Sequence, residues 1–225
     1  MTMATPPKQL RTWNAERANA YREKNPAQVV VFHHLLDASP SMYRHRHTLI
    51  SAYNQQLRWL QAHAFPMSLG QRVLFDDQIA PAPVQPLGLL APLTPAQYDP
   101  AASDGTALYE AMGAALVTQD TPGQHVLCLL TDGQDCCTRT AWTVTRVHEL
   151  FVTLQQERGW CGVFLGVDQD AKAVGQALGF PAAHCLDLAG DKIPEAFMTF
   201  QQAMQRFLQA PQAERMLLAA GGLFA

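Results

Sequence analysis

Short apolar runs alternate with amphipathic stretches along most of the chain. Residues 29–36, 124–130 and 160–167 are almost uniformly apolar and of strand length, which is typical of strands buried on both faces. Residues 71–75 and 183–188 predict two further strands. These five segments supply a sheet that other elements must cover.

Apolar positions three and four residues apart predict helices between these strands. In residues 42–63 the stripe runs through Met42, Leu49, Tyr53, Leu57 and Leu60, as one helix face requires. Further helices are expected at 107–117, 139–158, 171–178 and 193–208. Alternating strands and helices favour parallel strands joined by right-handed crossovers. We therefore expect an α/β fold with an open, mostly parallel, doubly wound (Rossmann-like) sheet and helices on both faces.

The pattern is weaker at both ends and in one internal segment. Residues 1–26 are polar and predict an arm or an outer helix, whereas residues 211–225 form an apolar tail without clear period that could dock a partner or pack on its own domain. Six prolines in residues 81–100 exclude an interior strand or a helix and favour an extended edge segment. One domain over residues 27–210 is expected.

The composition of the chain argues against several classes of function. The chain has 225 residues, 48% of them hydrophobic and 16% charged, with a net charge of −3, so a globular protein is expected and a nucleic-acid partner is not. No signal-peptide core and no run of about 18–20 apolar residues is visible, so we expect a cytoplasmic protein and no membrane partner. Five cysteines without C-x-x-C spacing predict neither a disulfide framework nor a zinc site.

Oxygen-bearing side chains gather where three of the predicted loops begin. Asp37, Ser39 and Ser41 follow the first strand, Thr106 precedes the helix at 107–117, and Asp132 follows the strand at 124–130. In open α/β sheets, ligands bind at the loops that leave the carboxyl ends of the strands. Two carboxylates and three hydroxyls suit a hard cation, so we expect Mg²⁺, with Mn²⁺ or Ca²⁺ as possible substitutes.

The motifs D-A-S-P-S, D-G-T-A-L-Y-E-A-M and L-L-T-D-G-Q-D resemble the metal-ion-dependent adhesion site (MIDAS) of von Willebrand factor A domains. The likeness extends over roughly residues 29–208 and includes a similarity to stand-alone bacterial and phage members of that family. It implies that Ser39 and Ser41 contact the metal directly and that Thr106 does so in the ligand-bound form. Asp37 and Asp132 would act largely through water, with Asp132 able to move into direct contact.

The resemblance also implies a function. The chain would be a non-enzymatic protein–protein interaction module, in which an Asp or Glu of a protein partner occupies the open metal position. Similar bacterial domains also suggest a role in stress or metal resistance. Asp104 and Asp135 are acids that could tune the site. Two departures from the family are Pro40 between the two serines and the Cys136-Cys137 pair after Asp132.

Two other functions remain open. A Mg²⁺-dependent phosphohydrolase of the haloacid dehalogenase type would need a carboxylate two residues after Asp37, where Ser39 stands. A metal-independent scaffold would bind through its helices or tail instead.

Two residue clusters each have a functional interpretation and a purely structural one. His33 and His34, and likewise His45 and His47, should point in different directions, so core and surface histidines are expected rather than a transition-metal site. Cys136-Cys137 could be a redox switch or plain loop thiols.

Overall fold

The computed structural model describes residues 15–100, 105–133, 135–137 and 141–224. Within them one mixed sheet has the strand order β3-β2-β1-β5-β6-β7, and β4 pairs with β2. The strands are β1 (Val30–Asp37), β2 (Leu69–Phe75), β3 (Ile79–Pro81), β4 (Gln85–Pro86), β5 (Gln124–Thr131), β6 (Cys161–Val167) and β7 (Cys185–Leu188). β1, β2, β5, β6 and β7 are parallel, whereas β3 and β4 run antiparallel to β2. The predicted mostly parallel sheet is confirmed.

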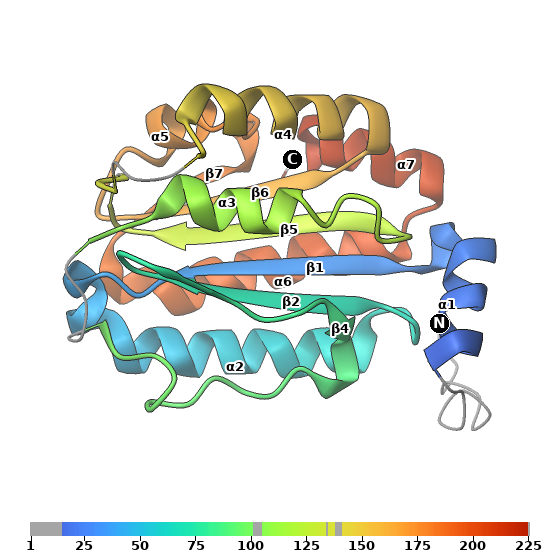
Figure 1. Ribbon diagram of the computed structural model, residues 1–225, viewed down its shortest axis with the longest axis horizontal. Helices are drawn as coiled ribbons and strands as arrows, with labels where there is room; N and C mark the ends of the chain where they lie inside the picture. Colours follow the sequence, from blue (N-terminus) through green and yellow to red (C-terminus); the bar gives the residue numbers. More distant parts are fainter. Residues whose placement is uncertain (1–14, 101–104, 134, 138–140, 225) are drawn as a thin grey trace.

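Helices cover both faces of this sheet (Figure 1). α2 (Arg46–His63) and α6 (Ile193–Gln209) pack on one face, and α3 (Leu108–Leu116), α4 (Val144–Arg158) and α5 (Ala171–Ala177) pack on the other. The central strands β1, β5 and β6 are buried along their whole length, which explains why most of their residues are apolar.

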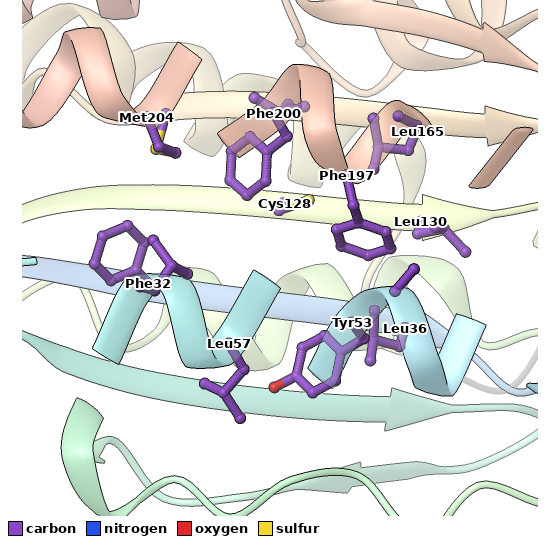
Figure 2. Close-up of a cluster of buried hydrophobic side chains, with 14 of the residues drawn as sticks. Phe32, Leu36, Tyr53, Leu57, Cys128, Leu130, Leu165, Phe197, Phe200 and Met204 are labelled. Atoms are coloured by element: carbon purple, nitrogen blue, oxygen red, sulfur yellow. The ribbon is translucent and has the colours of Figure 1, made fainter. Parts of the chain in front are cut away.

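The two faces have separate cores because successive strand residues point in opposite directions. Phe32 and Leu36 of β1 face α2 and α6, where Phe197 and Phe200 meet them (Figure 2). Leu35 faces α3 and α4 in the second core. This alternation decides which side chains of β1 enter each core, whereas the parallel pairing of β1 with β2 and β5 sets the edge at which its last residue, Asp37, leaves the sheet.

Three of the differences between predicted and observed element boundaries have a structural cause or a limit that can be named. The 3-10 helix η3 (Pro40–His45) precedes α2, so the predicted helix at 42–63 is wrong over its first turn. α4 begins at Val144, and the start predicted at residue 139 lies outside the described residues. The 3-10 helix η6 (Ala182–His184) replaces the first residues of the last predicted strand. The proline-rich segment does lie at the sheet edge, as β3 and β4.

α1 (Ala15–Lys24) and α7 (Gln212–Leu217) lie toward the amino ends of the parallel strands, away from their carboxyl ends (Figure 1). α1 lies near the start of β1. The tail forms α7 and a π-helical turn, η8 (Leu218–Gly222), and buries Ala219 and Leu223 in the core beside α6. No helix in the described part of the chain is long and apolar enough to cross a membrane.

Candidate metal centre

The candidate site lies where the neighbouring strands β1 and β5 end. Leu36 of β1 is in register with Leu130 of β5, so Asp37 and the loop that follows Thr131 leave the sheet side by side. Both strands are parallel, and their carboxyl ends therefore deliver Asp37 and Asp132 to one edge.

A continuous chain of hydrogen bonds joins the two loops. Ser39 Oγ lies 3.0 Å from Ser41 Oγ, and Ser41 Oγ donates to Asp132 Oδ1 at 2.7 Å. Ser39 is buried, Asp132 is half-buried and Ser41 is exposed. The three side chains thus form a cluster of oxygen atoms that is closed toward the sheet and open toward solvent.

Asp37 lies beneath this cluster and is completely buried. Its Oδ1 accepts the backbone N–H of Ser39 at 2.7 Å, and its Oδ2 accepts the Thr131 hydroxyl at 2.5 Å. Burial raises the pKa of the Asp37 carboxyl to about 6, although the hydrogen bonds from Thr131 and Ser39 oppose that rise and the nearby Asp132 adds to it. The ionised form of this buried carboxyl group has hydrogen bonds but no positive charge among the partners named here. A cation bound next to it would therefore stabilise it.

Thr106 approaches the loop that carries Asp132 from a third loop. Its side chain is almost fully buried, and its Oγ1 lies 3.6 Å from the place that a Cβ on Gly133 would occupy. Because Gly133 follows Asp132 directly, the Thr106 hydroxyl faces the loop that carries this carboxylate. The structure therefore brings all five predicted residues to one edge of the sheet.

The donor set fits a hard cation. Two carboxylates and three hydroxyls offer oxygen only, which suits Mg²⁺ better than a soft metal. Within the described residues no three His, Cys, Asp or Glu side chains are grouped to hold a metal. Any ion at this edge would therefore depend on the hydroxyls of Ser39, Ser41 and Thr106 as well as on the two acids.

Three supporting residues were not predicted. Thr131 orients Asp37, the Tyr98 hydroxyl donates to the Asp37 carbonyl at 2.5 Å, and Gln169 Nε2 donates to the Thr131 carbonyl at 2.7 Å. Thr131 directly precedes Asp132 in the T-D-G motif, so its position was a usable signal. Tyr98 and Gln169 come from distant segments, and nothing in their local sequence indicates these contacts.

The additional acids and thiols lie around the cluster. Asp135 Oδ1 accepts the N–H of Tyr109 in the first turn of α3 at 3.1 Å, and burial raises the pKa of its carboxyl. Cys136 Sγ accepts the N–H of Thr106 at 3.0 Å. Asp104, the other acid predicted near the site, lies outside the described residues.

The histidines do not form a metal cluster in the described part of the chain. His33 contacts Gln71 and His125, whereas His34 packs against Phe32 and the edge of Tyr53. The two rings thus point into opposite cores, as the alternation of side chains along a strand predicts.

Comparisons with known proteins were made for both sequence and structure. No family model matches the sequence, and no curated protein matches it. Solved structures do match. The von Willebrand factor domain of the type V pili tip protein Mfa5 from Porphyromonas gingivalis has a TM-score of 0.57 at 11% identity, over 82% of this chain and 97% of that one. A von Willebrand factor type A protein from Catenulispora acidiphila has a TM-score of 0.51 at 15% identity, over 79% of this chain and 42% of that one. This chain has a von Willebrand factor A fold.

A third structure with this fold was solved with a metal in its own MIDAS motif. Proximal thread matrix protein 1 from the mussel byssus, described with a zinc-occupied MIDAS motif, has a TM-score of 0.53 at 14% identity. The match covers 76% of this chain and 46% of the mussel protein. This chain therefore spans less than half the length of that protein, and at such low identity the likeness shows the von Willebrand factor A fold alone.

Proposed function

We propose that this von Willebrand factor A domain holds one divalent cation through Asp37, Ser39, Ser41, Thr106 and Asp132, and uses it to bind a partner protein. The partner would supply an Asp or Glu carboxylate to an open position on the cation. The observation that carries the proposal is the hydrogen-bonded chain from Ser39 through Ser41 to Asp132, which joins two loops around one point.

The chemistry of the donors supports binding by carboxylate coordination. Hydroxyl ligands are neutral, so a divalent cation beside them keeps more of its positive charge than it would among several carboxylates. The exposed Ser41 and half-buried Asp132 leave the solvent side of the cluster accessible to a second molecule. Mg²⁺ is the proposed ion because all the donors are oxygen, and the zinc-occupied site of the mussel protein supports a divalent ion at this place in the fold.

The same geometry favours a binding module over a phosphohydrolase. A haloacid dehalogenase enzyme uses a second carboxylate as acid and base, and the residue at that position, Ser39, presents a hydroxyl that lies against Ser41. We therefore expect no turnover of p-nitrophenyl phosphate with Mg²⁺ present. Measurable turnover that Asp37→Asn abolishes would support the enzyme instead.

The first test is binding of the metal alone. Since only the native state assembles the five donors, Mg²⁺ or Mn²⁺ at about 100 times its Kd should stabilise the fold by about 2.7 kcal/mol. For a chain of this length that corresponds to a rise in melting temperature of about 5–10 °C. Ser41→Ala and Thr106→Ala should lose the rise, whereas Ser51→Ala, an exposed serine on α2, should keep it. An equal rise in Ser41→Ala would contradict the site.

The second test asks whether the bound ion accepts a carboxylate. With Mn²⁺ in the site, water-proton relaxation reports the water molecules on the metal, and a carboxylate that replaces one of them lowers the relaxivity. Acetate and an Asp-containing peptide should lower it, whereas acetamide and the matching Asn peptide should not. No difference between the acid and the amide would overturn carboxylate recognition while leaving metal binding intact.

A further inference from the structure

Cys136 and Cys137 are two adjacent thiols at the rim of the candidate metal centre. Cys136 is exposed and Cys137 is half-buried, whereas Cys128, Cys161 and Cys185 are buried. The pair therefore offers reagents from solvent two neighbouring sulfur atoms that the metal centre does not use.

The two sulfur atoms converge on one place. A Cβ on Gly105 would lie 3.4 Å from Cys136 Sγ and 3.5 Å from Cys137 Sγ, so both thiols border the space that this glycine leaves free. Cys136 Sγ accepts the N–H of Thr106 at 3.0 Å, and the Cys137 thiol donates to the carbonyl of Asp77 at 3.7 Å. The backbone of two other loops thus holds both thiols against the same glycine.

This geometry suits a bridging atom better than a direct disulfide. Adjacent Cα atoms of a trans peptide lie about 3.8 Å apart, below the range of about 4.4–6.8 Å that disulfides normally span. A larger atom bound to both sulfurs removes that constraint. Zinc would require about four ligands, and within the described residues no third or fourth Cys, His, Asp or Glu joins the pair. A three-coordinate centre, which needs only two protein ligands, remains.

We infer that Cys136 and Cys137 form a chelating site for a thiophilic trivalent metalloid centre, of which arsenous acid is the simplest example. In this reaction two S–H bonds and two As–OH bonds break, two S–As bonds form and two molecules of water leave. Arsenic keeps one hydroxyl group and stays trivalent, so no oxidant or reductant is required.

Occupation of this site should also disturb the neighbouring cation site, an effect that rests on the proposed function. Cys136 makes two hydrogen bonds with Thr106. Its backbone N–H donates to the Thr106 carbonyl at 3.0 Å, and its sulfur accepts the Thr106 N–H. A sulfur atom bound to arsenic is a poorer acceptor and is drawn toward Cys137. Thr106 therefore loses a restraint, and the affinity for a divalent cation should fall.

The test uses the full chain with phenylarsine oxide as the probe, followed by native mass spectrometry and counting of solvent-accessible thiols. We expect a 1:1 adduct that blocks two thiols, withstands excess 2-mercaptoethanol and is reversed by dithiothreitol. Cys136→Ser and Cys137→Ser should each weaken the adduct about 100-fold or more, because the second bond is intramolecular. Cys185→Ser, at a buried thiol, is the matched control and should bind normally. An adduct that survives in Cys136→Ser, or that 2-mercaptoethanol removes, would overturn the site.

A Mn²⁺ titration before and after arsenical treatment separates this inference from the proposed function. We expect about 10-fold weaker Mn²⁺ binding in the adduct, the size typical of losing a support of a metal ligand. An adduct with unchanged Mn²⁺ affinity would overturn the coupling and leave the chelating site standing. If the untreated chain binds no Mn²⁺, the proposed function and the coupling both fail, whereas the adduct still decides the thiol site.

Discussion

Thr131 shows how one buried hydroxyl determines the orientation of a candidate metal ligand. Its side chain is fully buried and donates to Asp37 Oδ2, while the Ser39 N–H occupies Oδ1. Each carboxylate oxygen therefore has one lone pair engaged by the protein and one left for water or a cation. The Thr131 hydroxyl also accepts the N–H of Gly133 at 3.1 Å, so the same atom shapes the loop that carries Asp132.

Replacing Thr131 with valine should weaken divalent cation binding. The substitution keeps the shape of the side chain but removes the hydrogen bonds to Asp37 and Gly133, and loss of a group that orients a metal ligand typically costs about 10–100-fold in affinity. Calorimetric titration with Mn²⁺ measures the change. Thr131→Ser retains the hydroxyl and serves as the control, with affinity close to wild type. Wild-type affinity in Thr131→Val would show that Thr131 does not support a metal site.

At the scale of elements, the sequence predicted the strands well and the helix ends poorly. β1, β5 and β6 are buried on both faces, so most positions are apolar and the signal does not depend on period. The start of α2 was missed because Pro40 begins a 3-10 turn, in which the Met42 N–H donates to the Ser39 carbonyl. The start of α4 carried a usable signal, since the hydroxyl of Thr143 caps it by accepting the N–H of Arg146.

The shared location of the candidate site residues was predictable from the parallel arrangement of the strands. Parallel strands bring their carboxyl ends to one edge, so the motifs after β1 and β5 had to lie together once the fold was assigned. The supporting contacts of Tyr98 and Gln169 were not predictable, because they depend on how long connections return to that edge. The structure of the tail could not be predicted either, because η8 contains Gly221 at φ 151°, which interrupts the helical period of its apolar residues.

The tail contributes to the fold through its last turn. Leu223 is completely buried, its N–H donates to His184 Nε2 at 3.2 Å, and its carbonyl accepts from Arg206 at 2.5 Å. Leu217, six residues earlier, is 73% exposed. The tail thus has one buried leucine and one exposed leucine six residues apart.

These two leucines provide a matched test of the role of the tail. Leu223→Ala should lower the free energy of unfolding by about 2–5 kcal/mol, as expected for a leucine truncated in a well-packed core. Leu217→Ala should change it by no more than about 0.5 kcal/mol, because its side chain stays in solvent. Urea unfolding followed by circular dichroism measures both. Equal effects of the two substitutions would argue against a tail that is part of the core.

At the scale of the whole molecule, buried histidines make the fold sensitive to acid. His33, His34 and His125 lie in the centre of the sheet, and His33 Nε2 contacts His125 Nδ1 at 2.9 Å. Burial is the main cause that lowers their pKa values, to about 4 for His33 and about 3 for His34 and His125. The folded state therefore holds these rings neutral at a pH at which the unfolded chain, with a histidine pKa of about 6.5, binds protons.

The sign of the pH dependence follows from these pKa values. The stability that these histidines contribute is fully present above about pH 6.5. It is lost as pH falls from there toward about pH 4 for His33 and about pH 3 for His34 and His125, because only the unfolded state takes up the protons. Each histidine contributes a slope of up to about 1.4 kcal/mol per pH unit. Asp37 acts in the opposite direction, since its raised pKa means that the cost of burying its charge is relieved below about pH 6. Burial also lowers the pKa of His184 and raises the pKa values of Asp76 and Asp135, so both directions gain further groups. The pKa values of His33, His34 and His125 lie further from their ordinary value than that of Asp37 does, so the net effect of acid is destabilising.

Urea unfolding at pH 7.5 and pH 5.0, with EDTA present so that no cation binds, should show a lower midpoint at pH 5.0. His34→Leu should reduce the difference, because neither ring nitrogen of His34 has a hydrogen-bond partner among the described residues and an apolar side chain suits its surroundings beside Phe32 and Tyr53. His47→Leu, at an exposed position on α2, should leave the difference unchanged. If His34→Leu kept the full pH dependence while folding normally, the acid sensitivity would have to arise from groups other than this buried ring, and the proposal that His34 is held neutral in the core would fail.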